Sequence, residues 1–128
     1  MKYLTAEQVL FIHARLIEET GGEHGLLDLG LLRSAVGRPQ ASFDGQDLYP
    51  DLFSKAAAML ESLIGNHAFL DGNIRTAITA AGLFLRINGY RMIASNQELE
   101  EFTLQCAQGL VSLKRMALWL ETQSEMTP

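Results

Sequence analysis

The sequence contains one cysteine, three prolines and one tryptophan, and it has no long uninterrupted apolar run. Cys106 therefore cannot form an internal disulfide, and no His/Cys cluster has the spacing of a zinc site. No stretch approaches the roughly 20 consecutive apolar residues that cross a bilayer, and residues 1–10 lack the basic start and apolar core of a signal peptide. We therefore expect a reduced, cytoplasmic protein without a membrane partner.

Clustered positive charge is also missing. Ten lysines and arginines stand against fifteen aspartates and glutamates, which gives a formal charge of -5. Affinity for a nucleic-acid backbone depends on clustered Lys and Arg, so we expect no direct nucleic-acid binding. A length of 128 residues fits one domain with one core, and we assign residues 1–128 to a single domain.

Apolar residues recur at three- and four-residue spacing in six segments, and no alternating strand pattern of useful length appears. Thr5, Asp28, Asp51, Ser95 and Ser112 each precede such a segment and are suited to capping a helix. The predicted helices run from residue 5 to 20, 28 to 36, 51 to 65, 74 to 87, 95 to 109 and 112 onward, with a loop at 40–50. This pattern predicts a compact all-α fold.

Residues 67–73 break the helical pattern and lead into a helix that is apolar nearly all round, which we therefore expect to be central and buried. Unpaired N–H groups and the helix dipole make such a helix start attractive to anions. Gly72 would let the backbone approach a phosphate, His67 is a candidate general base, and Asp71 can hold Mg²⁺. With the amide of Asn73 and the guanidinium of Arg75, these are the groups that phosphoryl transfer requires.

Each of these residues also has a structural interpretation. His67 is suited to capping a helix end, Asp71 and Gly72 to a turn, and Arg75 to the solvated surface; taken singly, such roles are the commoner ones. An arginine in the first helical turn opposes the dipole, so its position is easier to explain if a bound anion compensates it. The residues alone predict an anion-binding loop and leave open whether it is catalytic.

The same segment resembles the signature of the Fic family. The run His67-Ala68-Phe69-Leu70-Asp71-Gly72-Asn73-Ile74-Arg75 is similar to H-x-F-x-D/N-G/A-N-K-R, the form that the motif takes in the Doc branch. The resemblance extends to the turn at 21–22 and to residues 37–41 and 84–89. It implies a Fic-fold bundle of about six helices with a central helix after the motif, and a nucleotide-using toxin that modifies a protein hydroxyl.

The resemblance also implies a role for each motif residue. His67 would remove the proton of the target hydroxyl, Asp71 would coordinate Mg²⁺ on the phosphates of ATP, and Arg75 would neutralise those phosphates as a further catalytic residue. Phe69 would pack the loop onto the core. The residues implied to form the nucleotide-binding loop are Phe69, Gly72, Asn73, Ile74 and Arg75.

Two reactions are known in the family, and the motif does not decide between them. Most Fic proteins transfer AMP from ATP, whereas the Doc branch acts as a kinase that phosphorylates elongation factor Tu and halts translation. The resemblance to that branch predicts a kinase of a translation factor, with AMP transfer as the alternative. No segment fits the inhibitory pattern S/T-x-x-x-E-G/N of many Fic proteins, so the resemblance implies a Phd-type antitoxin whose helix inhibits in trans.

Ile74 departs from the family pattern, in which Lys or Gly occupies this position. A charged group near the phosphates supplies several kcal/mol of transition-state stabilisation, so its loss predicts an activity lower by orders of magnitude. Two explanations remain open: a natural residue with altered or degenerate chemistry, or a substitution that escaped toxicity during cloning. Ile74 also motivates a third interpretation, a catalytically weak module that chiefly binds its antitoxin.

Overall fold

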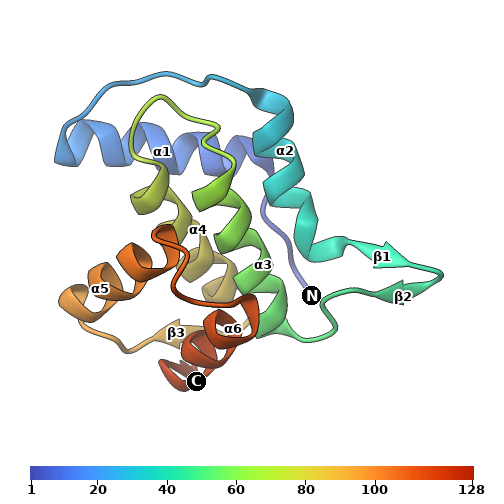
Figure 1. Cartoon of the computed structure of the whole chain (residues 1–128). Helices are drawn as coiled ribbons and strands as arrows, with labels where there is room; N and C mark the ends of the chain where they lie inside the picture. The colour runs from blue at the N-terminus through green and yellow to red at the C-terminus, as the bar shows by residue number, and fades with distance from the viewer.

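The chain folds into a helical bundle, and the computed structural model describes all 128 residues (Figure 1). The all-α fold class is confirmed, and all six predicted helices are present. The helices are α1 (Ala6–Thr20), α2 (Leu29–Gly37), α3 (Leu52–Gly65), α4 (Asn73–Ile87), α5 (Asn96–Ala107) and α6 (Leu113–Thr122). No helix is both long enough and apolar enough to cross a bilayer.

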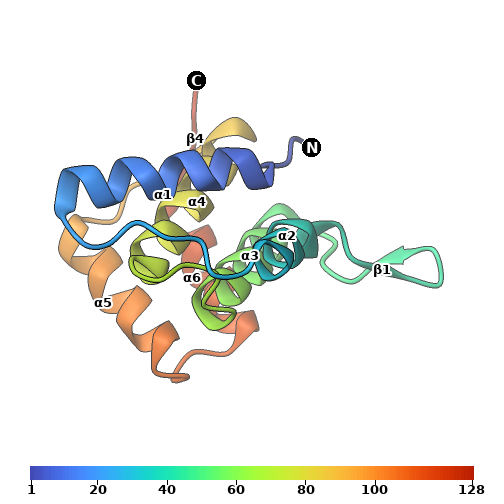
Figure 2. The ribbon, with the colours of Figure 1, turned by 90° about the horizontal axis from the view of Figure 1, so that it is seen from above.

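Two small antiparallel sheets and a short 3-10 helix supplement the six helices. They comprise η1 (Arg38–Gln40), β1 (Ser42–Phe43) paired with β2 (Gln46–Asp47), and β3 (Tyr90–Met92) paired with β4 (Ser124–Met126). The expected loop at 40–50 thus contains a hairpin, which projects away from the bundle (Figure 2). Asp44 and Gly45 both have positive φ angles, 53° and 78°, as a two-residue type I′ turn requires. Strands of two or three residues are too short to show an alternating pattern in the sequence.

Side chains determine where five of the helices begin. Each accepts a hydrogen bond from the backbone N–H of the third helical residue, and the five are Thr5, Asp28, Asp51, Ser95 and Ser112. Because these N–H groups have no partner inside the helix, a capping oxygen stabilises the helix start. Helix α4 differs, since its N-cap is Gly72 and no side chain caps it.

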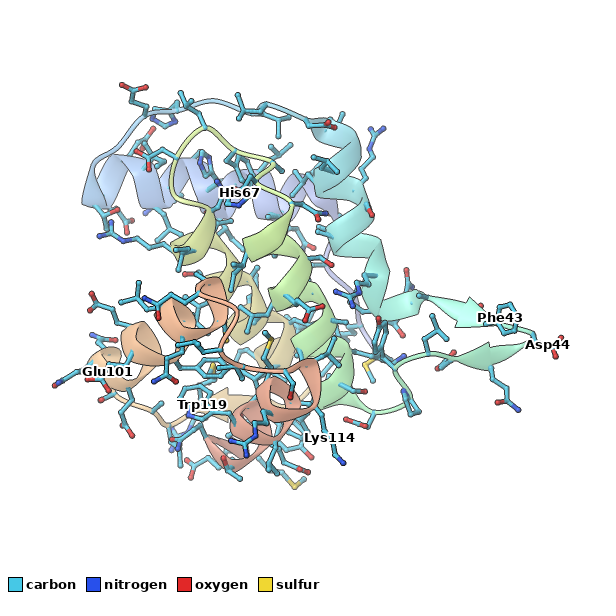
Figure 3. The ribbon with its side chains drawn as sticks, viewed as in Figure 1. Phe43, Asp44, His67, Glu101, Lys114 and Trp119 are labelled. Atoms are coloured by element: carbon cyan, nitrogen blue, oxygen red, sulfur yellow. The ribbon has the colours of Figure 1, made fainter.

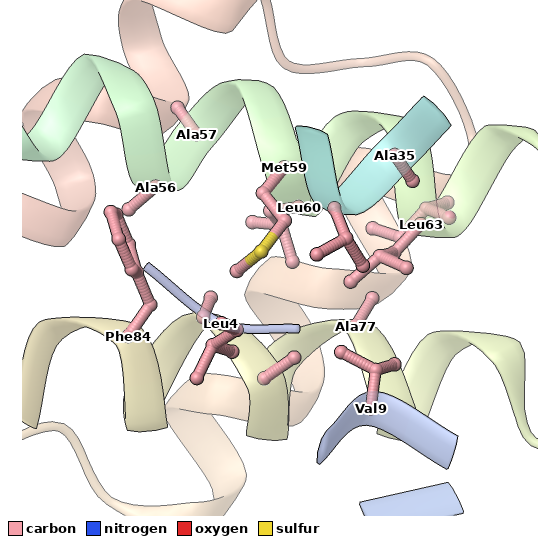
Figure 4. Close-up of a cluster of buried hydrophobic side chains, with 14 of the residues drawn as sticks. Leu4, Val9, Ala35, Ala56, Ala57, Met59, Leu60, Leu63, Ala77 and Phe84 are labelled. Atoms are coloured by element: carbon pink, nitrogen blue, oxygen red, sulfur yellow. The ribbon is translucent and has the colours of Figure 1, made fainter. Parts of the chain in front are cut away.

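The core lies between α3 and α4 (Figure 4). Eight of the fourteen residues of α3 and six of the fifteen residues of α4 are buried. Met59 and Leu60 of α3 and Phe84 of α4 are fully enclosed, and Val9 of α1 closes one side of the cluster. The expected central position of α4 is confirmed, because α1, α3, α5 and β3 all pack against it. It shares the centre with α3, which is the more buried helix.

Two loops meet where α1 crosses one end of this pair (Figures 1 and 2). We call residues 66–72, between α3 and α4, the motif loop, and residues 21–28, between α1 and α2, the strap. The motif loop and the strap are joined as neighbouring strands are: the Leu70 N–H donates to the Gly25 carbonyl at 3.0 Å, and the Leu27 N–H to the Ala68 carbonyl at 2.7 Å. The strap therefore fixes one side of the motif loop against the body of the protein.

Candidate active site

The motif loop and the start of α4 line a cavity of about 580 Å³. Six of the seven predicted site residues face it, namely His67, Asp71, Gly72, Asn73, Ile74 and Arg75. Ile17 of α1 and Gly22 of the strap also line it. The seventh predicted residue, Phe69, does not line the cavity and is buried beneath the loop. The fold therefore brings the predicted polar groups together at one open site.

His67 has an unusual backbone conformation. Its φ angle is 49°, in the left-handed region that few residues other than glycine adopt. Such a conformation costs on the order of 1–3 kcal/mol and persists where the surrounding structure holds it, often at functional sites. The side chain is exposed and lies at the end of α3, on the side crossed by α1 (Figure 3). It is the only predicted base that faces the cavity.

The Asp71 carboxylate is held in place by two backbone N–H groups. Oδ1 accepts from Gly72 N at 2.8 Å, and Oδ2 accepts from Glu23 N in the strap at 3.1 Å. A carboxylate has about four acceptor positions, so both oxygens keep capacity for a further ligand. No group of three or more His, Cys, Asp or Glu residues could enclose a metal. This donor set fits Mg²⁺, which is commonly bound through one or two carboxylates together with water and substrate phosphates.

The Asn73 side chain closes the motif loop on itself. Its Oδ1 accepts from Phe69 N at 3.1 Å, and its Nδ2 donates to the Phe69 carbonyl at 2.8 Å. Its amide is therefore engaged with the loop backbone, which leaves its backbone N–H, in the first turn of α4, as its remaining donor. Gly72 adopts a left-handed conformation, φ 76°, immediately before the helix. The N–H groups of the first turn of α4 are thus presented to the cavity without a side-chain cap, which is the arrangement of an anion site.

Arg75 is the only lysine or arginine among the residues that line the cavity. Its side chain is exposed and takes part in none of the four ion pairs of the protein. Ile74 lies beside it and contributes apolar surface. The groups of the cavity that can attract an anion are therefore Arg75 and the start of α4, and position 74 adds no charge.

His13 and Ile17 of α1 form the floor beneath the motif loop. His13 is buried, and its Nε2 lies 2.8 Å from the carbonyl oxygen of Asp71. Its ring stacks on Phe69 with 3.8 Å between the centroids. This partner of His13 could not be foreseen from the sequence, because it lies 58 residues away. Glu23 and Gly22 of the strap were missed for the same reason.

A second cavity of about 340 Å³ lies on the other side of His67 and Ile74. Cys106 faces it, as do Ile64, Met116 and other apolar side chains. Burial, followed by the nearby Glu61 carboxylate, raises the pKa of the Cys106 thiol to about 11. The thiol therefore stays protonated at neutral pH and is no nucleophile.

A groove of about 630 Å³ opens from the site between α4 and α5. Thr20, Ile74 and Arg75 line both the groove and the active-site cavity. The groove is also lined by Ile78 of α4 and by Leu99 and Leu104 of α5. A molecule bound in this groove would contact the three shared residues at the mouth of the cavity.

Comparisons with known proteins give the same assignment as the motif. A model of the Fic/DOC family matches residues 3–85, a range that includes the strap, the motif loop and most of α4. The protein "Toxin Doc" of Mycolicibacterium smegmatis is 50% identical over 93 residues, which cover 73% of this chain and 69% of that protein. "Protein kinase doc" of Escherichia phage P1 is 34% identical over 117 residues, or 91% of each chain.

Proposed function

The chain belongs to the Fic/DOC family, and on that basis we propose that it is a Doc-type toxin and a protein kinase. Its substrates would be ATP and a hydroxyl group of a translation factor, elongation factor Tu. The observation that carries the proposal is the convergence of His67, Asp71 and Arg75 around the uncapped start of α4. A base, a metal-binding carboxylate and an anion site in one cavity are the components of phosphoryl transfer.

In this proposal the first turn of α4 holds the phosphates of ATP through its N–H groups, and Arg75 neutralises their charge. When bound at Asp71, Mg²⁺ would stabilise the negative charge that develops on the phosphates. His67 accepts the proton of the target hydroxyl as its oxygen bonds to the γ-phosphorus. The bond from that phosphorus to the bridging oxygen breaks, and ADP leaves with the electron pair. Fixed donors aimed at developing charge supply most of the acceleration in such sites.

The test uses ATP labelled in the γ- or the α-phosphate, with Mg²⁺ and purified elongation factor Tu. Label from the γ position supports kinase chemistry. Label from the α position would mean attack at the α-phosphorus with release of pyrophosphate, and would replace the kinase assignment by AMP transfer. No label from either position, with this chain and with its Ile74→Lys variant, would contradict the proposed substrate or the proposed activity.

Ile74 makes the lysine variant informative in its own right. The cavity of this chain has one arginine or lysine, and Ile74→Lys adds a second beside the anion site. Restored charge near the phosphates predicts a gain of about 10- to 1,000-fold in kcat if the chain is a weakened kinase. Ile74→Met is the matched control, because it changes the shape of the side chain without adding charge. Equal rates for the three proteins would show that position 74 does not limit transfer.

We further propose that a Phd-type antitoxin inhibits this chain by placing a helix in the groove between α4 and α5. The groove presents Ile78, Leu99 and Leu104, and Leu104 is 47% exposed. A helix that binds in a groove inserts the apolar side chains of one face, and these three residues offer an apolar lining for them. Because Ile74 and Arg75 line both groove and site, an occupant would cover the mouth of the cavity.

A charged substitution in the groove tests this proposal. Leu104→Arg should weaken antitoxin binding while leaving uninhibited transfer unchanged. Leu118→Arg is the matched control, since Leu118 is 59% exposed and lies in other surface grooves, at α6. Isothermal titration calorimetry with the antitoxin measures the affinity of both variants. If Leu118→Arg lowers the affinity and Leu104→Arg does not, the antitoxin binds at α6, and the proposal of the groove between α4 and α5 is wrong.

A further inference from the structure

We propose that His13 is a positioning residue of the active site, which holds the backbone at Asp71 and so directs the metal-binding carboxylate and the start of α4. The role in catalysis rests on the proposed function. The role in loop geometry rests on contacts of the chain alone. Nothing in the motif indicates this residue, which lies in α1 and approaches the loop from beneath.

The hydrogen bond between His13 and Asp71 has a defined direction. Nε2 of His13 lies 2.8 Å from the Asp71 carbonyl oxygen. A carbonyl oxygen only accepts, so Nε2 carries the proton and donates it. His13 is 4% exposed, so water has little access to replace the donor. Loss of the N–H would leave a carbonyl without its partner at the point where the loop turns into α4.

The ring of His13 makes a second contact with the same loop. It lies nearly parallel to the ring of Phe69, with 8° between the planes and 3.8 Å between the centroids. A Cβ built on Gly72 would lie 3.7 Å from the His13 ring, so the loop backbone rests directly on it. The ring thus supports the loop from below while its N–H fixes the peptide between Asp71 and Gly72.

This peptide links the groups that the proposed reaction needs. It follows the Asp71 side chain, whose carboxylate is held by Gly72 N and Glu23 N, and it precedes the first turn of α4. A rotation of the peptide would turn the carboxylate and the α4 N–H groups away from their common ligand. Misplacement by about 1 Å can reduce a rate by roughly 100-fold even when the changed residue is remote from the chemistry.

Two variants separate the N–H donor of His13 from its ring. His13→Phe keeps a flat ring against Phe69 and removes the donor. His13→Gln removes the ring and keeps an amide N–H that reaches a similar position. Val9→Ala is the control for lost packing, because Val9 is fully buried in α1 one turn earlier and belongs to the core cluster. All three are compared at a temperature at which each is folded.

The first measurement is amide hydrogen exchange at Glu23, Leu70 and Gly72. The first two N–H groups donate hydrogen bonds between the strap and the motif loop, and the third donates within the loop. We expect faster exchange at these amides in His13→Phe than in Val9→Ala or His13→Gln. Equal exchange in His13→Phe and Val9→Ala would overturn the proposal. So would exchange in His13→Gln as fast as in His13→Phe. This measurement needs no nucleotide and is independent of the proposed kinase activity.

The second measurement is kcat and KM for transfer from Mg²⁺-ATP. We expect kcat to fall about 10- to 100-fold in His13→Phe, to recover at least partly in His13→Gln, and to stay unchanged in Val9→Ala. A kcat in His13→Phe equal to that of the unmodified chain would overturn the positioning role. Absence of transfer by the unmodified chain and by Ile74→Lys would contradict the proposed function instead, and the exchange measurement would still decide the role of His13.

Discussion

Five helices of this protein begin with a side-chain cap, whereas α4 begins with a glycine in a left-handed conformation and has none. At the five capped starts, an oxygen of the chain itself occupies the position that an anion would otherwise take. At α4 that position faces the cavity formed with the strap. A glycine at the N-cap gives up only about a few tenths of a kcal/mol relative to a capping side chain, so the start of α4 stays free of a cap at a small loss of stability. The comparison separates the five helix starts that the chain caps itself from the one that faces the cavity.

The largest effect should come from the motif loop itself. His67→Ala is expected to lower transfer by about 10²- to 10⁴-fold, the usual contribution of a general base. Stability should change by no more than about 1 kcal/mol, because the side chain is exposed. His24→Ala is the control, since His24 is an exposed histidine of the strap that does not line the cavity. Transfer assays and urea denaturation measure the two quantities, and undiminished transfer in His67→Ala would remove His67 from its role.

A smaller loss should follow from a change in the strap. A Cβ on Gly22 would lie 2.7 Å from Asp71 Oδ2, whereas a Cβ on Gly21 would meet nothing within 4 Å. Both glycines have positive φ angles, so alanine is strained at either. Gly22→Ala should displace the carboxylate and lower transfer by roughly 10- to 100-fold, while Gly21→Ala should not. Similar rates for the two variants would show that the strap does not position Asp71.

A change at a capped helix start should lower the stability of the protein and leave the rate of transfer unchanged. Asp51 caps α3 by accepting from Ser54 N at 2.8 Å, far in sequence from the motif loop. Asp51→Ala should lower the free energy of unfolding by about 1 kcal/mol, within a range of 0.5–2, and leave kcat unchanged. Urea denaturation and transfer assays test this. A matching loss of kcat in folded protein would break the distinction between the two kinds of helix start.

The smallest effect concerns the capping boxes of α1 and α5. Hydrogen bonds from the Ser95 backbone and side chain lower the pKa of Glu98. A carboxylate with a lowered pKa stabilises the fold above its ordinary value of 4.5 and loses this contribution as the pH falls through its folded-state pKa. Glu98→Gln should therefore have a lower Tm than the unmodified chain at pH 7, and the two Tm values should approach each other as the pH falls through the folded-state pKa of Glu98. The corresponding box of α1 uses Gln8, so the effect of Gln8→Ala should not depend on pH in this way.

Features that depend on neighbouring residues were predictable from the sequence. All five capping residues were identified, because each bonds to an N–H only three positions along the chain. The motif loop was identified in the same way, since its chemical groups are consecutive. Five helices follow directly from these caps and the apolar spacing. The sixth, α4, follows from its apolar pattern and from the motif before it.

Features that depend on long-range packing were not predictable. Lys55 lies in α3 and is 3% exposed, with its Nζ donating to the Pro39 carbonyl at 3.1 Å and to Asp47 Oδ2 at 3.3 Å. Nothing in the local pattern distinguishes it from a surface lysine. The engagement of the Asn73 amide by the loop backbone is likewise a matter of loop geometry. The sequence thus predicted six of the residues that line the cavity and could not predict which residues support them.

The contact between His13 and Asp71 spans 58 positions of the chain. The full motif can therefore be synthesised, and α4 can form, before the motif loop has its final geometry. Contacts between distant residues form late in folding, because closing a long loop has an entropic cost. If His13 positions the loop as proposed, the loop would gain its final geometry only when α1 has docked on α4. For a protein proposed to arrest the machinery that synthesises it, activity would then coincide with the end of folding.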